Sequence, residues 1–316
     1  MHPWNEALFE ALKARSARLP HALLVHGARG TGKLALAERV AQYLLCEGPA
    51  DRPCGRCEGC RWFVAGSHPD FRRVEPEALQ KEPAVEPEEG AEGGPAKRGK
   101  PSLQIKIEQV RELAGFLNLG SHRGRLRVAL VHPADDMNEN AANALLKGLE
   151  EPPPGAVFVL VSHRPSKLLP TIRSRCVALA VAIPPAAVAL EWLKSQQVAN
   201  PERWLAYAGG APLQALQYAA KAEVFERLLQ RPQPVDDREE LEALADALQK
   251  IALDRALAAF GLSPKYHTIE GGSPASSEAR AWLGYAREMG QHRDLCRHPL
   301  NPKLFSAAML AGMPKL

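Results

Sequence analysis

The sequence lacks any apolar run long enough to cross a membrane, and it has no strong excess of charge of one sign. Its 316 residues carry a formal net charge of +4, so overall electrostatics give no argument for nucleic-acid binding. The N-terminus also lacks the charged start and the apolar core of a secretion signal. We therefore expect a cytoplasmic protein with no membrane partner, long enough for two or three domains.

Cysteine is scarce outside one short segment, where four of the six cysteines cluster. Their pattern is Cys46-x7-Cys54-x2-Cys57-x2-Cys60, and two-residue spacings allow successive thiolates to bind one small ion. Four thiolates complete a closed tetrahedral site, so we predict a structural Zn2+ rather than a catalytic metal. The alternatives are a disulfide, which the reducing cytosol disfavours, a redox-active Cys54–Cys57 pair, and an iron–sulfur cluster.

A glycine-rich loop follows an apolar run near the N-terminus and precedes an alanine- and leucine-rich helical stretch. Gly27, Gly30, Gly32 and Lys33 belong to a G-x-x-x-x-G-K segment, which is part of the phosphate-loop pattern. In such a loop backbone N–H groups surround phosphates, and the lysine supplies a positive charge. We predict a vestigial phosphate loop at these residues, with Trp4 either covering it or packed in the core.

The residues that would hold magnesium beside this loop are missing. Leu34 stands where a Ser or Thr hydroxyl should follow the lysine. His132 follows the buried strand expected at 126–131, where a nucleotide hydrolase needs a carboxylate. Asp135 and Asp136 come later, and we expect them to point elsewhere. The sequence thus predicts a P-loop ATPase fold with little or no hydrolysis and doubtful ATP binding.

Strand and helix patterns alternate through the first part of the chain and then give way to helices alone. The alternation of apolar strands with helices predicts a parallel, doubly wound α/β sheet. Residues 76–102 are rich in Pro, Gly and charge, which predicts a disordered surface insertion. The segments 183–224 and 225–316 contain no convincing strand, so we expect both to be helical.

Several segments carry a resemblance to one known family. Together they resemble the clamp-loader branch of the AAA+ ATPases, in its bacterial DNA polymerase III form, over about 1–75 and 103–225. Besides the four-cysteine segment, the matching sequences are Pro-His-Ala-Leu-Leu at 20–24, Ala-Ala-Asn-Ala-Leu-Leu-Lys at 141–147, Glu-Glu-Pro-Pro at 150–153, and Leu-Leu-Pro-Thr-Ile-Arg-Ser-Arg-Cys at 168–176.

The resemblance implies three domains and a set of partners. They are an AAA+ domain at 1–182 with a zinc module at 46–60, a helical lid at 183–224, and an all-α collar at 225–316. The missing metal residues, with Leu213 where a motor subunit has its lid arginine, are typical of a non-hydrolysing stator. The implied partners are gamma/tau motor subunits, the delta subunit, the sliding clamp and primed DNA, in cytoplasm near the nucleoid.

The resemblance also implies one chemical role, carried by the Ser-Arg-Cys triplet at 174–176. Arg175 is expected to act in trans as an arginine finger on ATP bound by a neighbouring motor subunit, with Ser174 in support. A guanidinium is always charged, and its planar fork matches phosphate oxygens. Such a group stabilises the charge that develops during phosphoryl transfer. Arg173 is the rival candidate for this role.

Two other functions remain as alternatives. The chain would be a self-sufficient ATPase if Asp135 or Asp136 held the metal. It would be a zinc-dependent nucleic-acid-binding module if the cysteine segment contacted DNA, which the near-neutral charge and the lack of aromatic residues between Cys46 and Cys60 disfavour.

Overall fold

The chain forms two compact units, Met1–Ala182 and Ile183–Leu316. The computed structural model describes residues 1–15, 19–49, 51–80, 101–119, 126–268, 278–296, 298 and 300–314. Within these residues, no helix combines the length and the apolar character that a membrane crossing requires.

A parallel sheet of five strands forms the centre of the first unit, in the order β2-β3-β4-β1-β5. This arrangement confirms the predicted fold class. The inner strands β1, β3 and β4 are almost wholly buried, because helices cover both faces of the sheet. The strands are β1 (Ala22–His26), β2 (Phe71–Val74), β3 (Arg127–Val131), β4 (Ala156–Ser162) and β5 (Val177–Ala180).

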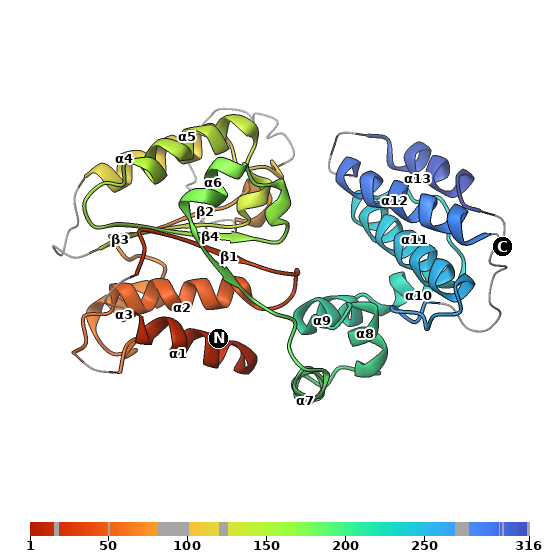
Figure 1. Cartoon of the computed structure of the whole chain (residues 1–316), viewed down its shortest axis with the longest axis horizontal. Helices are drawn as coiled ribbons and strands as arrows, with labels where there is room; N and C mark the ends of the chain where they lie inside the picture. Colours follow the sequence, from red (N-terminus) through yellow and green to blue (C-terminus); the bar gives the residue numbers. More distant parts are fainter. Residues whose placement is uncertain are drawn as a thin grey trace, which may run out of the picture. The chain divides into compact units, whose positions relative to one another are not determined.

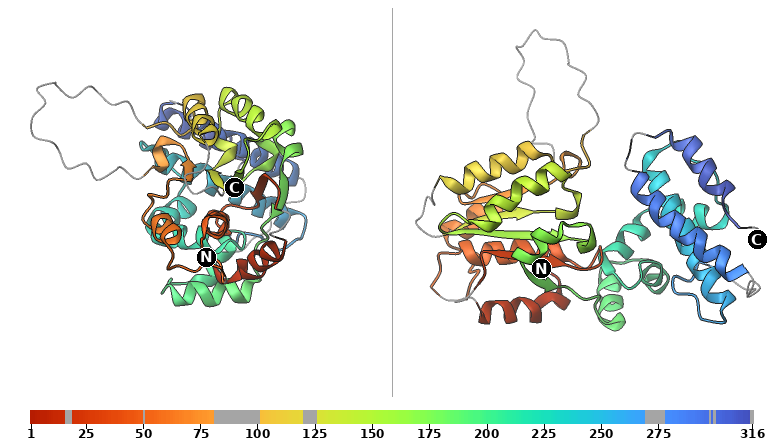
Figure 2. Two further views of the ribbon diagram at one scale, coloured as in Figure 1. Left: turned by 90° about the vertical axis from the view of Figure 1, so that its left-hand side faces the viewer. Right: turned by 45° about the horizontal axis from the view of Figure 1, so that its top comes forward.

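The helices of the first unit lie in two layers (Figures 1 and 2). One face of the sheet carries α4, α5 and α6, and the other carries α1 and α2, with α3 directly after α2. The helices are α1 (Glu6–Ala14), α2 (Lys33–Leu45), α3 (Glu58–Val64), α4 (Ile107–Asn118), α5 (Glu139–Glu150) and α6 (Pro170–Arg175); the 3-10 turns are η1 (Pro3–Asn5), η3 (Glu77–Leu79), η4 (Ala134–Asp136) and η5 (Pro165–Lys167).

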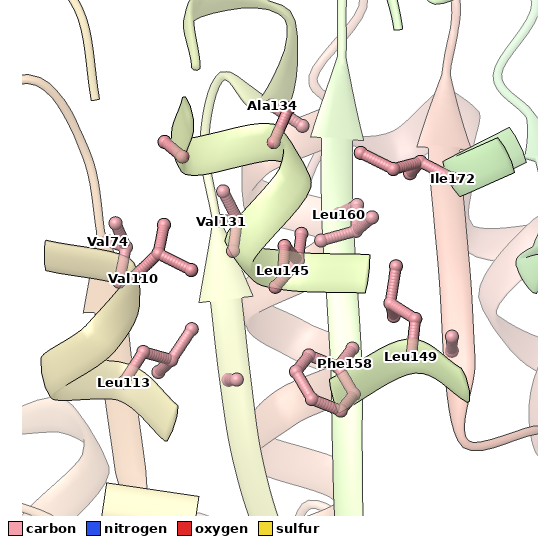
Figure 3. Close-up of a cluster of buried hydrophobic side chains, with 14 of the residues drawn as sticks. Val74, Val110, Leu113, Val131, Ala134, Leu145, Leu149, Phe158, Leu160 and Ile172 are labelled. Atoms are coloured by element: carbon pink, nitrogen blue, oxygen red, sulfur yellow. The ribbon is translucent and has the colours of Figure 1, made fainter. Parts of the chain in front are cut away.

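Alternating strand residues feed two separate hydrophobic clusters, one on each face. On β4, Phe158 and Leu160 face the α5 side chains Leu145 and Leu149 (Figure 3). Val159, between them, belongs to the cluster on the opposite face. Helix α5 presents its apolar residues at helical spacing, so one face of it is buried against the sheet. The buried sheet therefore positions the loops that lie at the two ends of its strands.

The insertion predicted at 76–102 has ordered ends, so its predicted limits are wrong. Glu77–Leu79 form the turn η3, and the Ala78 N–H donates to the Ser102 carbonyl at 3.1 Å. The Glu77 carboxylate accepts the Ser102 N–H at 2.9 Å, which closes the base of the insertion. The rest of the predicted disorder, at 81–100, lies outside the described residues.

The described residues of the second unit form helices only, as the sequence predicts. Its Asp246 carboxylate accepts the Tyr218 hydroxyl at 3.0 Å and pairs with Lys250 Nζ at 2.7 Å, so α9 contacts α11. The division of this unit into a lid and a collar stays a prediction. The helices are α7 (Ala186–Ser195), α8 (Pro201–Tyr207), α9 (Pro212–Ala220), α10 (Ala222–Gln230), α11 (Arg238–Ala259), α12 (Ala279–Leu295) and α13 (Pro302–Ala311).

Candidate functional site

The four clustered cysteines come together at the C-terminal end of α2. Their sulfur atoms all lie within 4.8 Å of one another, and Cys46 Sγ is 3.9 Å from Cys57 Sγ. A tetrahedral zinc ion with bonds of about 2.3 Å holds its sulfurs about 3.8 Å apart, which the Cys46–Cys57 distance matches. The six cysteines of the chain carry no disulfide. The predicted group of Cys46, Cys54, Cys57 and Cys60 can therefore hold a metal ion.

Backbone N–H groups surround the sulfurs of this cluster. Cys46 Sγ accepts from the N–H groups of Gly48 and Cys54, each at 3.4 Å. Hydrogen bonds from the N–H groups of Arg56 and Cys57 lower the pKa of Cys54 to about 6. Burial instead raises the pKa of Cys60 to about 12, so a bound cation is what would keep this sulfur in its thiolate form.

The phosphate loop lies at the other end of α2 and keeps its backbone geometry. Gly30 and Gly32 have φ values of +83° and +82°, which only glycine adopts without strain. A Cβ on Gly27 would lie 2.3 Å from the Val181 carbonyl oxygen, so the loop packs directly on the chain after β5. Trp4 Nε1 donates to the Thr31 carbonyl at 2.9 Å, which places this side chain on the loop.

Lys33 is the first residue of α2, and its side chain turns back onto its own loop. Its Nζ donates to the Ala28 carbonyl at 2.5 Å, and only 2% of the residue is exposed. Burial lowers the pKa of Lys33 to about 8, while the Asp135 carboxylate acts in the opposite direction. Next to it, Leu34 packs against the hydrophobic cluster beneath α2. The position for a metal-binding hydroxyl is thus filled by an apolar side chain.

The two carboxylates beyond β3 are already engaged by the segment after β4. Asp135 accepts the His163 N–H at 2.8 Å and the Arg164 Nε at 3.2 Å. Asp136 also pairs with Arg164, at 3.6 Å from Nη2. Burial alone would raise the pKa of Asp135, but hydrogen bonds from the His163 N–H and from the Ser162 and Arg164 side chains hold it below its usual value. Asp135 also acts on the pKa of Lys33, so it lies near the phosphate loop, and the expectation that both carboxylates point elsewhere stays a prediction.

Two histidines stand where the sheet edge of a hydrolase would present ligands and polar groups. The rings of His132 and His163 lie edge to face, with centroids 5.5 Å apart. Burial, reinforced by nearby cations, lowers the pKa of His132 to about 4 and that of His163 to about 3. Both rings are therefore neutral near pH 7, and neutral imidazoles do not replace the oxygen ligands that magnesium prefers.

Arg175 lies at the opposite edge of the sheet from the phosphate loop. Leu23 of β1 pairs with Val177 of β5 in parallel register, so Arg175 precedes the amino end of β5. Gly27 leaves the carboxyl end of β1, four residues beyond Leu23, which is about 13 Å along a strand. The phosphate loop and Arg175 of one chain are thus not assembled into one site.

The Arg175 guanidinium makes polar contacts with neighbouring parts of its own unit. Nη2 lies 2.5 Å from Glu150 Oε1, at the end of α5. Nη1 donates to the Thr171 carbonyl at 3.0 Å and lies 3.5 Å from Ser174 Oγ. The Ser174 hydroxyl itself donates to Thr171. Among the described residues, the exposed Arg173 has no ion-pair partner.

Sequence reasoning missed three residues of these sites: Arg164, His163 and Glu150. A usable signal existed for the first two, because β3 and β4 are adjacent and parallel. Residues that follow neighbouring parallel strands meet at the same edge of the sheet. Glu150 gave no such signal, since its contact with Arg175 depends on how α5 packs on α6.

Comparison with known proteins places the chain in a family. A family model described as "DNA polymerase III, delta subunit" matches residues 4–184, which is more than half of the chain. The chain belongs to this family. The matched region contains the cysteine cluster, the phosphate loop and Arg175, and the family resemblance predicted from the sequence is confirmed.

Curated relatives of the family match much of the chain. The DNA polymerase III subunit delta' of Pseudomonas aeruginosa is 43% identical over 220 residues, covering 68% of this chain and 60% of the relative. The Escherichia coli K12 subunit delta' is 35% identical over 221 residues, with the same coverage. The E. coli K12 subunit tau is 32% identical over 161 residues, covering 51% of this chain and 21% of tau. The chain thus matches 60% of the length of these two delta' relatives and 21% of tau.

One solved structure shares the fold over nearly the whole chain. A DNA polymerase III gamma subunit-related protein from Thermotoga maritima superposes with a TM-score of 0.53 at 20% identity. The superposition covers 96% of this chain and 97% of that protein. At this identity the likeness concerns the fold alone.

Proposed function

We propose that the chain is a delta'-type stator subunit of a DNA polymerase III clamp loader. It binds gamma/tau motor subunits and the delta subunit, and it supports ATP-dependent loading of the sliding clamp on primed DNA. It does not hydrolyse ATP itself. Its contribution to chemistry is Arg175, which completes the nucleotide site of a neighbouring motor subunit.

The observation that carries this proposal is that the phosphate loop and Arg175 lie far apart within one chain. The phosphate loop keeps its glycines but has Leu34 at the metal position, and Arg164 engages Asp135 and Asp136. Arg175 meanwhile lies at the far edge of the sheet, away from that loop. An arginine that its own chain cannot use is well suited to a site formed with a second subunit.

We further propose that the four-cysteine cluster holds a structural Zn2+. Its support is the mutual distance of the sulfurs and the ring of N–H donors around them. With four cysteine ligands the ion has no open position, so it would stabilise the turn between α2 and α3 and take no part in catalysis.

The test is ATP hydrolysis by a loader reconstituted with the wild-type chain, Arg175→Ala or Arg173→Ala. The isolated chain should be inactive, with or without Lys33→Ala. Arg175→Ala should lower DNA- and clamp-stimulated hydrolysis, by about a thousandfold at the one site that it serves, while assembly persists. Arg173→Ala is the matched control and should leave the rate unchanged.

Other outcomes would favour other functions. ATP turnover by the isolated chain that disappears in Lys33→Ala would support a self-sufficient ATPase and end the stator proposal. A loss of hydrolysis in Arg173→Ala alone would move the finger two residues upstream. Salt-dependent DNA binding by the isolated chain that disappears when metal is removed would support a nucleic-acid-binding module.

A further inference from the structure

The Arg175 guanidinium is held by a carboxylate of its own chain. Glu150 is the last residue of α5, and Arg175 is the last residue of α6. Their charged groups lie 2.5 Å apart, and 34% of the Arg175 side chain and 48% of the Glu150 side chain are exposed. The pair is therefore reachable by a partner subunit.

The position of Glu150 is unfavourable for its own helix. The C-terminal end of a helix carries partial negative charge, so a carboxylate there is repelled by the last carbonyl groups. A cation normally occupies such a place. The ion pair with Arg175 offsets this repulsion, which ties the conformation of the Arg175 side chain to α5.

The contacts that Arg175 makes within its own chain compete with binding a phosphate. Nη2 faces Glu150 and Nη1 donates to the Thr171 carbonyl, so each outer nitrogen of the fork already uses one of its two N–H donors. A bidentate contact with phosphate oxygens needs two N–H donors of this same fork. The ion pair also offsets the charge of the guanidinium and fixes its orientation, so we expect the side chain to leave Glu150 when it binds a nucleotide on a neighbouring subunit.

We propose that Glu150 is a positioning residue whose carboxylate holds Arg175 away from the neighbouring nucleotide site. This ion pair, which we call the latch, lowers hydrolysis in the loader until clamp and primed DNA are bound. This inference rests on the proposed function. An exposed ion pair shifts an equilibrium by only about two- to fivefold, so the latch is weak. The higher negative charge of a triphosphate then suffices to displace the carboxylate once the subunits are aligned.

The test uses the reconstituted loader with Glu150→Gln, which removes the charge and keeps the side-chain size. Hydrolysis without DNA and clamp should rise about two- to fivefold. The rise should be in kcat, with KM for ATP unchanged, because the neighbour's own loop binds the nucleotide. Hydrolysis stimulated by DNA and clamp should stay near the wild-type rate. Glu150→Asp keeps the carboxylate, so its unstimulated rate should lie between those of the wild type and Glu150→Gln.

Glu151→Gln is the matched control, since Glu151 is the next residue, is exposed, and has no ion-pair partner among the described residues. It should behave as wild type. The double variant Glu150→Gln with Arg175→Ala should equal Arg175→Ala alone, because the latch acts only through the guanidinium.

The outcomes separate the latch from the finger. An unchanged or lower unstimulated rate in Glu150→Gln, together with a loss in Arg175→Ala, refutes the latch and leaves the finger standing. A neutral Arg175→Ala refutes both. An equal rise in Glu151→Gln shows a general charge effect and also overturns the latch.

Discussion

The two ends of helix α2 differ in whether the residues needed to bind a metal ion are present. At its N-terminal end, the phosphate loop keeps its positive-φ glycines but has lost its metal ligands. At its C-terminal end, Cys46 caps the helix, and all four thiols needed for a closed metal site are present. The N-terminal end keeps the backbone conformation of a phosphate loop without its metal ligands. The C-terminal end keeps a full set of four thiol ligands.

The difference shows what each end contributes to the fold. The phosphate loop packs on Val181 and receives hydrogen bonds from Trp4 and Asn5, so its shape is supported by the protein alone. The cysteine segment has few apolar side chains of its own, and a short segment of that kind depends on a bound ion for its shape. We therefore expect losses at the second end to be the more costly.

Substitution in the cysteine cluster should produce the largest effect. Cys60→Ser removes a ligand of the closed site, so metal content should fall below one ion per chain and stability should drop by several kcal/mol. Metal analysis and thermal unfolding measure both. Cys176→Ser, half-buried and outside the cluster, is the control and should keep its metal. A Cys60→Ser protein with full metal content and an unchanged melting temperature would show that the cysteine end of α2 does not depend on this ligand, and the contrast with the phosphate-loop end would be lost.

Lys33→Met should sharpen the comparison through pH. The folded state lowers the pKa of Lys33 from 10.5 to about 8, so between these values the unfolded chain binds more protons. Stability of the wild type relative to Lys33→Met should therefore rise between pH 8 and 10.5, by up to about 3 kcal/mol. Urea unfolding of both proteins across this range measures it.

The control for this pH series is Lys13→Met, since Lys13 lies in the same unit and is only partly buried, with 27% of its side chain exposed. It should track the wild type at every pH. A stability difference between wild type and Lys33→Met that stays flat over the range would mean that the Lys33 ammonium is not desolvated in the folded loop.

Leu34→Thr should have the smallest effect, because it restores one ligand to a site that lacks the others. We expect no ATP hydrolysis by the isolated variant, since Arg164 still engages Asp135 and Asp136. Loss of the partly buried Leu34 side chain should cost about 1 kcal/mol. A phosphate-release assay with magnesium checks the activity, and any turnover would show that one hydroxyl revives the phosphate-loop end.

The sequence predicted these regions to different depths for physical reasons. Buried parallel strands are continuous apolar runs, so β3, expected at 126–131, could be located within one residue. The close spacing of the four cysteines likewise predicts a shared metal site. The link from Asp135 to Arg164 joins residues 29 apart and required the order of the strands. The pairing of Glu150 with Arg175 required the packing of two helices, which no local pattern encodes.

Strand β5 lies at the edge of the sheet, where β1 is its one partner among the strands that the structure describes. Residues 177–183 carry no charge, and Val177 and Ile183 are largely exposed. Proteins normally protect such an edge with lysine, proline or a bulge, since its unpaired backbone groups recruit other strands. The isolated chain should therefore self-associate at high concentration, and a partner that covers this edge, as in the proposed loader, would prevent it.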